Sequence, residues 1–310
     1  MCGLQRTICN ATVNKTIVPT VASAWNGTDI ATAFQSGSGT EADPYVIFSG
    51  AQLAYLAQQV NAGTTYEGVY FVLSADIDLG GQAMTVIGLD SDHVFKGHID
   101  GKGYVIRNFT ITSDGLVVGL FGYFYGTLKN LGIETANIAA TRTGNGPIYV
   151  GGLVAHSSGT IQNCYSKVTV TAECGYAVYA GGLVGYNKGS VTNSYANGDV
   201  IANSTNFGAY AGGLIGDNEG TVSGSVAYGN VTAKGYNDGY SVVGGLVGAN
   251  SGTVTDCYRN SAQVVTKYTA TDTASNDLGK SVTMEEIRTY CSFNWDDIIW
   301  KFSTLLPKFV

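Results

Sequence analysis

One 15-residue stretch, GGLVGYNKGSVTNSY from Gly181, recurs along this chain and constrains its fold more than any other feature. Related copies begin at Gly151, Gly212 and Gly244, and a weaker copy begins at Val118. The clear copies start 30, 31 and 32 residues apart. A period of this size is typical of an array in which each repeat is one structural unit that stacks on its neighbours.

Each repeat is rich in Gly, Val, Tyr, Thr and Asn and contains few helix-forming residues. Short apolar runs are separated by Gly, Asn or Asp, and this pattern predicts about three short strands per repeat, joined by tight turns. We therefore expect an all-β fold, a right-handed parallel β-helix solenoid in which one repeat forms one coil. Successive coils would be about 4.8 Å apart, so that equivalent residues stack in columns.

Three of these columns carry predictions. The leucine column is expected in the core and consists of Leu120, Leu153, Leu183, Leu214 and Leu246. The asparagine column is expected in a turn, because Asn beside Gly tolerates left-handed backbone angles and stacked amides can bond to one another; it consists of Asn187, Asn218 and Asn250. Cys164 and Cys257 share a column but are three coils apart, too far for a disulfide, so buried thiols are expected.

The N-terminal part of the chain precedes the clear repeats. Residues 1–24 carry no repeat and are interpreted as an extended arm or linker, either a docking segment for a larger assembly or a disordered leader. Residues 25–117 are expected to form an N-terminal cap and the first coils. A helix from Ser49 to Val60, capped by Ser49, would cover the open strand edges of the first coil.

The repeat β-helix is expected over residues 118–270 and a small C-terminal cap over residues 271–310. In this cap a short helix would begin at Thr283, which caps it with its hydroxyl group. The aromatic residues that follow would seal the last coil, namely Trp295, Trp300 and Phe302.

Composition excludes several classes of partner. The formal net charge of −7 argues against nucleic acid, whose phosphates require a basic surface. No stretch approaches 18 apolar residues, so no membrane insertion is expected. The cysteines and histidines have no metal-type spacing, so neither a metal nor a cofactor is expected.

The N-terminal residues contain no apolar segment of the kind found in signal peptides. Two interpretations follow. Either this is a mature or trimmed form of a secreted protein, or the protein leaves the cell by another route, as phage virion proteins do. We therefore expect an extracellular or cell-surface location, with a phage virion as the alternative.

The repeats, exemplified by GGLVGYNKGSVTNSYANGDV, resemble the GLUG motif of bacterial surface proteins. The block WNGTDIATAFQSGSGTEADPYVI resembles the segment that precedes such repeats in secreted proteins of gut bacteria, and FNWDDIIWKF resembles the tail that closes them. The resemblance covers roughly residues 25 to 310. It implies a β-helix in an adhesin-like, extracellular setting, and it supplies no established catalytic residues.

Two columns are candidate ligand-binding sites. Tyr149, Tyr179 and Tyr210 share one column; strand alternation places it on the face of the leucines, which favours the core, and the alternative is a platform on which sugar rings stack. Tyr186 and Asp217 share a second, more exposed turn column next to the asparagines. Its binding residues would be Tyr186, Asn187, Asp217, Asn218 and Asn250, unless these polar groups only satisfy the backbone.

Five carboxylates in a short region, Asp76, Asp78, Asp90, Asp92 and Asp100, are the remaining candidates for chemistry. Some β-helix lyases hold calcium with acidic clusters, and glycosidases use carboxylate pairs. The spacing here fits no ligand pattern, so surface carboxylates are expected. A Ser-His-Asp set with His93, His98 or His156 lacks the sequence of a nucleophile elbow. We expect no catalytic residues.

The sequence thus favours a non-enzymatic attachment protein, whose rigid side face binds a glycan or a surface protein through side chains on consecutive coils. One alternative is a phage decoration or receptor-binding protein docked through residues 1–24. Another is a polysaccharide lyase or hydrolase, which requires the acidic residues to converge with a basic partner. A purely structural spacer is a further alternative.

Overall fold

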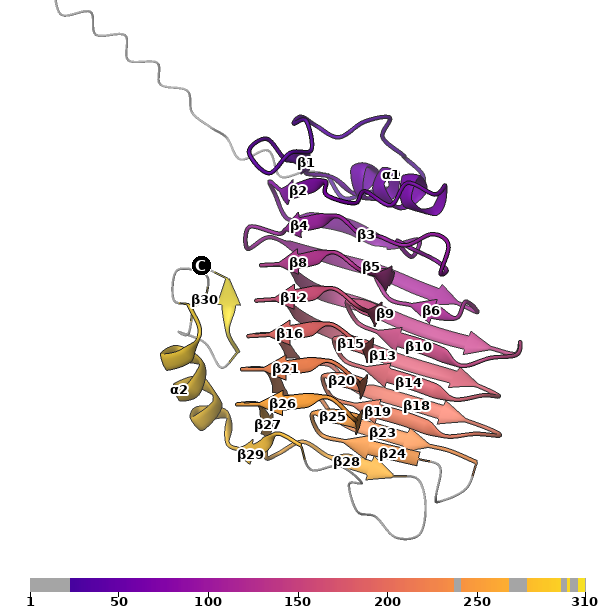
Figure 1. Cartoon of the computed structure of the whole chain (residues 1–310), viewed down its shortest axis with the longest axis vertical. Helices are drawn as coiled ribbons and strands as arrows, with labels where there is room; N and C mark the ends of the chain where they lie inside the picture. The colour runs from indigo at the N-terminus through magenta and orange to yellow at the C-terminus, as the bar shows by residue number, and fades with distance from the viewer. Residues whose placement is uncertain (1–22, 237–240, 268–277, 297–299, 302–305, 310) are drawn as a thin grey trace, which may run out of the picture.

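The computed structural model is a parallel β-helix of about six coils stacked along one axis (Figure 1). The structure describes residues 23–236, 241–267, 278–296, 300–301 and 306–309. Within these ranges the chain forms two short helices, and all other regular structure is β-strand. The predicted fold class is therefore confirmed. The proposed arm of residues 1–24 lies outside the described residues, apart from its last two.

The strands lie in four sheets, which we call A, B, C and D, and each coil between Val117 and Lys267 contributes to all four. Sheet A contains, in order, β1 (Tyr45–Ile47), β2 (Tyr70–Leu73), β4 (His98–Asp100), β8 (Thr127–Lys129), β12 (Thr160–Gln162), β16 (Ser190–Thr192), β21 (Thr221–Ser223) and β26 (Thr253–Thr255). Sheet C contains β7 (Phe121–Phe124), β11 (Val154–Ser157), β15 (Val184–Asn187), β20 (Ile215–Asn218) and β25 (Val247–Asn250). Sheet D contains β6 (Val117–Val118), β10 (Ile148–Gly151), β14 (Val178–Gly181), β19 (Ala209–Gly212) and β24 (Ser241–Gly244).

Sheet B is the most extensive and includes the longest strands. It contains β3 (Ile77–Ala83), β5 (Val105–Ser113), β9 (Gly132–Arg142), β13 (Tyr165–Cys174), β17 (Tyr195–Ala196), β18 (Val200–Ser204), β22 (Val226–Ala227), β23 (Val231–Lys234), β27 (Tyr258–Asn260), β28 (Val265–Lys267) and β29 (Lys280–Val282). All pairings within the four sheets are parallel. The prediction of three strands per coil missed the short strand of sheet D, because β14 runs into β15 through the glycine pair Gly181-Gly182.

The core follows the predicted columns. The five leucines of the leucine column have no exposed surface. Cys164, Ser194, Ser225 and Cys257 form another buried column, in which the backbone N–H of Cys164 donates to Ser194 Oγ at 3.1 Å and that of Ser194 donates to Ser225 Oγ at 3.2 Å. The two cysteines are free thiols, as predicted.

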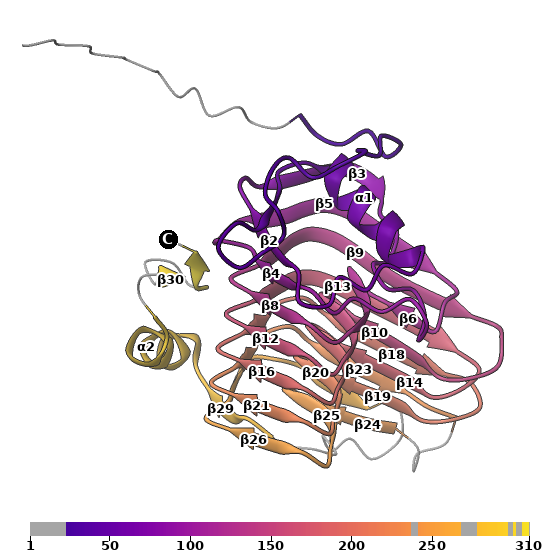
Figure 2. The same cartoon turned by 45° about the horizontal axis from the view of Figure 1, so that its top comes forward.

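The first coil is covered by helix α1 (Gly50–Asn61), which lies at the N-terminal end of the β-helix (Figures 1 and 2). Ser49 is its N-cap, and the Ser49 side chain accepts a hydrogen bond from the N–H of Gln52. Leu53, Leu56 and Val60 are buried in the main core. The predicted capping helix is therefore confirmed.

The asparagine column lies inside the β-helix, which corrects its predicted place in a turn. Asn187 and Asn218 have no exposed surface and lie at the ends of β15 and β20. The left-handed turn column is a different one, between sheets A and B. It consists of Asn163, Asn193, Gly224 and Asp256, with φ of 52°, 48°, 58° and 50°.

The C-terminal segment also differs from its prediction. Helix α2 (Met284–Asn294) begins at Thr283 with a capping box, as expected. However, α2 and the antiparallel pair β30 (Trp300–Lys301) and β31 (Lys308–Phe309) pack along the side of the coils (Figures 1 and 2). Trp295 and Trp300 are buried against an outward-facing apolar strip on sheet B. This strip consists of Tyr165, Tyr195, Val226 and Tyr258.

The strip explains the side-on packing, because an apolar outer face requires a cover. Trp295 Nε1 donates to the carbonyl of Gly224 at 2.8 Å, and the Tyr195 hydroxyl donates to the carbonyl of Pro307 at 2.7 Å. Phe302, the third aromatic residue of the predicted seal, lies outside the described residues. In the described part of the chain, neither helix has the length and apolar character to span a bilayer.

Candidate binding surface

The tyrosine column on sheet D faces outward. In β14, Val178 and Ala180 are buried, whereas Tyr179 between them is partly exposed; Tyr149 and Tyr210 occupy the same position in β10 and β19. The prediction that this column faces the core is therefore wrong. The chain bends at the glycine pair between the tyrosines and the leucines. Strand alternation therefore does not continue from one column to the other.

The bend at the glycine pair is tight. A Cβ atom on Gly181 would lie 2.0 Å from the carbonyl oxygen of Val184 and 2.7 Å from the amide nitrogen of Gly216. Glycine is required here because the backbones approach closely. The bend brings outward-facing side chains of sheets C and D together, with ring centroids 5.3 Å apart for Tyr149 and Tyr186.

We call the resulting group of partly exposed rings the tyrosine cluster. It consists of Tyr123, Tyr149, His156, Tyr179, Tyr186 and Tyr210. The rings of Tyr149 and Tyr179 stack at 5.1 Å and 15°, and those of Tyr179 and Tyr210 stack at 4.8 Å and 9°. Within the stack these rings cover one another's faces. The cluster therefore offers mainly ring edges and hydroxyl groups to a partner, and its role as a platform for sugar rings stays a prediction.

Charged groups border the tyrosine cluster. The Tyr186 hydroxyl donates to Glu219 Oε1 at 2.5 Å, and Lys188 Nζ lies 3.5 Å from Glu219 Oε2 and 5.4 Å from the centre of the Tyr186 ring. Asp217 follows Tyr186 in the same column, one coil further on. Burial and the neighbouring Glu219 raise the pKa of Asp217. The cluster is thus bordered by two carboxylates and one ammonium group.

Burial shifts the pKa values of several rings of the cluster toward the neutral form. Burial and the neighbouring tyrosines raise the pKa of Tyr179 to about 12. Burial also lowers the pKa of His156, and its buried Nδ1 atom has no hydrogen-bond partner among the residues that the structure describes. The Tyr179 hydroxyl group therefore remains a hydrogen-bond donor as well as an acceptor.

The second predicted column divides between outside and inside. Tyr186 and Asp217 are partly exposed, whereas the amide groups of Asn187 and Asn218 point into the β-helix and are buried. Asn218 Nδ2 donates to Asn250 Oδ1 at 2.8 Å, so Asn250 belongs to the same internal ladder. The three asparagines connect neighbouring coils, and the expectation that Asn187 and Asn218 are exposed is wrong, whereas Asn250 is partly exposed.

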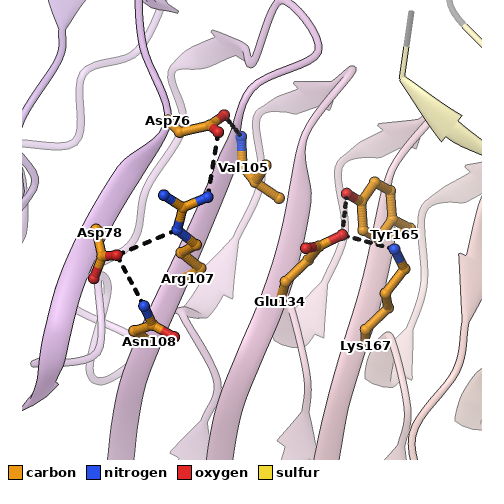
Figure 3. A network of polar contacts seen from close by, with 8 residues as sticks. All are labelled: Asp76, Asp78, Val105, Arg107, Asn108, Glu134, Tyr165 and Lys167. Atoms are coloured by element: carbon orange, nitrogen blue, oxygen red, sulfur yellow. Dashed lines mark hydrogen bonds and ion pairs between the residues drawn. The ribbon is translucent and has the colours of Figure 1, made fainter. Parts of the chain in front are cut away.

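A polar network on sheet B brings two of the five predicted carboxylates together (Figure 3). Arg107 lies between them, with its Nη1 3.4 Å from Asp76 Oδ2 and its Nε 3.3 Å from Asp78 Oδ2. Asn108 Nδ2 also donates to Asp78 at 2.8 Å. Burial raises the pKa of Asp78, but hydrogen bonds from Gly80, Asn108 and Arg107 outweigh burial and lower it.

A second polar group lies one strand further on, where Glu134 is the register partner of Arg107 and accepts from the Tyr165 hydroxyl at 2.8 Å and from Lys167 Nζ at 2.6 Å (Figure 3). Lys167 lies 4.6 Å above the centre of the Tyr165 ring. Sequence reasoning missed Glu134, Lys167 and Arg107. The signal was available, because these residues alternate with buried ones along β5, β9 and β13 and their spacing follows the coil.

The other carboxylates lie elsewhere. Asp90 Oδ1 is 2.7 Å from His93 Nδ1 in a local turn, and Asp100 pairs with Lys102. Among the described residues no group of three potential metal ligands is found. No serine hydroxyl hydrogen-bonds to His93, His98 or His156 in the part of the chain that the structure describes.

Comparison with known proteins identifies the repeats. A family model of the GLUG motif matches residues 146–171 and 176–201. A protein of Evansella cellulosilytica, provisionally named a Gly-rich membrane protein, is 35% identical over 139 residues, which are 42% of this chain. Halomucin of Haloquadratum walsbyi is 34% identical over 158 residues, which are 47% of this chain. The matched segments span only 15% and 2% of the length of these two relatives.

A solved structure shares the fold over most of its length. It is a crystal structure from Bacteroides ovatus, provisionally named an immunoglobulin A1 protease. It aligns with a TM-score of 0.65 and 25% sequence identity, and the alignment covers 89% of this chain and 95% of that one. Together with the family match, these similarities agree with the repeat pattern in the sequence. The chain therefore carries repeats of the GLUG motif, and these repeats form coils of a parallel β-helix.

Proposed function

We propose that this chain is the attachment part of a cell-surface or extracellular protein, and that it binds a glycan or a surface protein through the tyrosine cluster without chemical change. The names of the two relatives, a Gly-rich membrane protein and halomucin, support the surface location. The observation that carries the proposal is the row of partly exposed tyrosines on consecutive coils, which face away from the core. The relatives lend no support to the phage virion alternative.

Recognition in this proposal is by edges and hydroxyl groups. Stacked tyrosines have few rotatable bonds, so a partner orders little when it binds them. Their hydroxyl groups repeat at the spacing of the coils, and Asp217 and Glu219 beside them accept hydrogen bonds from a partner's hydroxyls or amides. A polar, shallow interface of this kind suits a glycan chain that contacts several coils at once. The mechanism requires neither a metal nor a cofactor.

The test is binding of the purified chain to an array of host and bacterial glycans, with bound sugars checked for cleavage. We expect retention without cleavage. Two variants locate the site: Tyr179→Ala removes the middle ring of the stack, and Tyr186→Phe removes one hydroxyl group. The control is Tyr236→Ala, because Tyr236 is 60% exposed and lies outside the cluster. Loss of retention in the first two variants and not in the third supports the proposal; equal retention in all three contradicts it.

Catalysis is a second candidate function, favoured by the name of the structural neighbour and by the way Arg107 joins Asp76 to Asp78. Incubation with immunoglobulin A1 and with acidic polysaccharides tests this candidate. Cleavage that disappears in Asp78→Asn would establish it and would replace the attachment proposal. Absence of both binding and cleavage would favour a structural spacer, with residues 1–24 as the docking segment to examine next.

A further inference from the structure

A cavity of about 290 Å³ lies against sheet A near the N-terminal cap. Strands β2, β4 and β8 contribute Tyr70, His98, Asp100 and Lys129 to its lining, and Glu41 and Pro44 line it from the preceding segment. The cavity shares no residue with the tyrosine cluster. It is therefore a separate site, and nothing in the proposed attachment function uses it.

The aromatic part of the lining is a pair of rings. Tyr70 and His98 are register partners on β2 and β4, and their rings stack with centroids 4.6 Å apart and an interplanar angle of 30°. Both side chains are partly exposed. Such a pair offers an apolar surface beside polar atoms, which suits a flat ligand with C–H groups on one side and hydroxyls on the other.

The charged part of the lining is centred on Asp100, whose side chain is only 12% exposed. Lys102 Nζ lies 3.1 Å and Lys129 Nζ 3.6 Å from the same oxygen, Asp100 Oδ2. The other oxygen, Oδ1, accepts from the backbone N–H of Lys102 and from Asn130 Nδ2, both at 2.9 Å. Two ammonium groups thus share the carboxylate of Asp100, and Glu41 contributes a second carboxylate elsewhere in the lining. The lysine side chains are 56% and 48% exposed, so a ligand can reach them.

The coil geometry does not require these residues. The column of His98 continues in later coils as Thr127, Thr160, Ser190, Thr221 and Thr253. The column of Asp100 continues as Lys129, Gln162, Thr192, Ser223 and Thr255. Short polar side chains are therefore sufficient on this face of sheet A, and the stacked rings and the charges are confined to the coils that line the cavity.

We propose that this cavity binds an acidic sugar, a monosaccharide unit that carries a carboxylate. The carboxylate contacts the ammonium groups of Lys102 and Lys129, and the sugar ring lies against Tyr70 and His98. Glu41, which forms no ion pair within the described residues, accepts hydrogen bonds from sugar hydroxyls. The volume lies at the small end of ligand sites, which run from about 300 to 1,000 Å³, so a single sugar unit is the expected size.

The test uses the full chain and two matched probes, methyl glucuronide and methyl glucoside, which differ in one carboxylate. Binding is measured by isothermal titration or by saturation-transfer NMR. We expect methyl glucuronide to bind about tenfold more tightly than methyl glucoside, and added salt to weaken this binding because it screens the charges. N-acetylneuraminate is a third probe, which separates sialic acids from uronic acids as the source of the carboxylate. Equal affinity for methyl glucuronide and methyl glucoside, or no binding of either acidic sugar, overturns the proposal.

Variants separate this site from the tyrosine cluster. Lys129→Ala and Tyr70→Ala should each weaken the binding of methyl glucuronide about tenfold. Lys280→Ala removes an exposed lysine on β29, outside both the cavity and the tyrosine cluster, and should leave this binding unchanged. Circular dichroism verifies that each variant is folded. If Lys129→Ala binds as well as the parent chain, the cavity is not the site. Binding that is lost in Tyr186→Phe instead would assign the sugar to the tyrosine cluster.

Discussion

The side-chain amide of Asn187 donates to Oδ1 of Asn218, one coil further on, at 2.7 Å, and neither side chain has any exposed surface. Each Nδ2 also faces the carbonyl of the glycine two residues later in its own coil, at 3.4 Å for Gly189 and 3.2 Å for Gly220. The ladder continues to Asn250. Buried amides are costly unless they are paired, and here each coil satisfies the amide of its neighbour.

Replacement of Asn218, the middle residue of the asparagine ladder, should therefore destabilise the β-helix. Asn218→Ala removes the acceptor of Asn187 and the donor to Asn250, and it leaves the buried Nδ2 of Asn187 with only the carbonyl of Gly189 at 3.4 Å. We expect a loss of about 1–3 kcal/mol in the free energy of unfolding. Urea unfolding followed by circular dichroism measures it. Asn206→Ala, at an exposed turn position, is the control and should change stability by no more than about 0.5 kcal/mol. Equal stability of the two variants would contradict a structural role for the ladder.

The glycine bend between sheets D and C yields a second prediction. In Gly181→Ala the new Cβ would lie 2.0 Å from the carbonyl oxygen of Val184, so the backbone must shift. We expect a loss of about 1–3 kcal/mol or more, together with altered packing of Tyr179 against Tyr186. Thermal unfolding measures the stability, and tyrosine fluorescence reports on the cluster. Gly175→Ala is the matched control, because a Cβ there would have its nearest neighbour at 3.4 Å. Should both variants unfold at the same temperature, the close approach is not limiting.

Acid should destabilise the fold. Burial raises the pKa of Asp100 and Glu134, but hydrogen bonds and lysine neighbours outweigh burial and hold both below the ordinary values of 3.8 and 4.5. Hydrogen bonds outweigh burial at Asp78 as well and lower its pKa. A carboxyl group with a lowered folded-state pKa stabilises the fold above its unfolded-state pKa, and this stabilisation is lost as the pH falls through the folded-state value. Asp217, whose pKa is raised, acts in the opposite direction but is a single group.

The urea midpoint, measured at a series of pH values, should therefore stay high near neutrality. It should decrease once the pH is below about the ordinary carboxyl pKa values. Glu134→Gln keeps an acceptor for Tyr165 but removes the titrating group, so its stability should depend less steeply on pH. Asp217→Asn is the opposite control and should make the dependence steeper. A urea midpoint that rises on acidification would mean that Asp217 outweighs the three paired carboxylates.

Much of the fold could be predicted from the sequence because the repeat fixes the register. The period placed Leu183 and Leu214 in the core and kept Cys164 apart from Cys257, whereas local capping chemistry located the helix starts at Ser49 and Thr283. Each of these predictions depends on local chemistry or on counting coils. Neither local chemistry nor the counting of coils requires knowledge of how the four sheets meet.

The candidate site was harder to predict, because the direction in which a side chain points, outward or into the core, depends on where the chain bends. Tyr179 and Leu183 are four residues apart, which means one face on a straight strand, but the bend at Gly181-Gly182 separates them into an outer and an inner position. The predicted place of the asparagine column was wrong for a related reason. Residue type favours a turn for Asn187, but its position at the end of β15 directs the side chain inward. The cavity at Asp100 has no repeat signal, because its residues break the column pattern.

The side-on C-terminal segment changes how the array should open. In a plain solenoid each coil contacts only the coils next to it, so unfolding can begin at one end and proceed step by step. Here the ring of Phe309 contacts that of Tyr165, and the carbonyl of Pro307 accepts a hydrogen bond from Tyr195. Trp295 donates to the carbonyl of Gly224, and the Tyr290 hydroxyl donates to the carbonyl of Asp256. These partners lie on four successive coils. The segment therefore fastens non-adjacent coils to one another, and the stretch beneath it should melt as one cooperative unit.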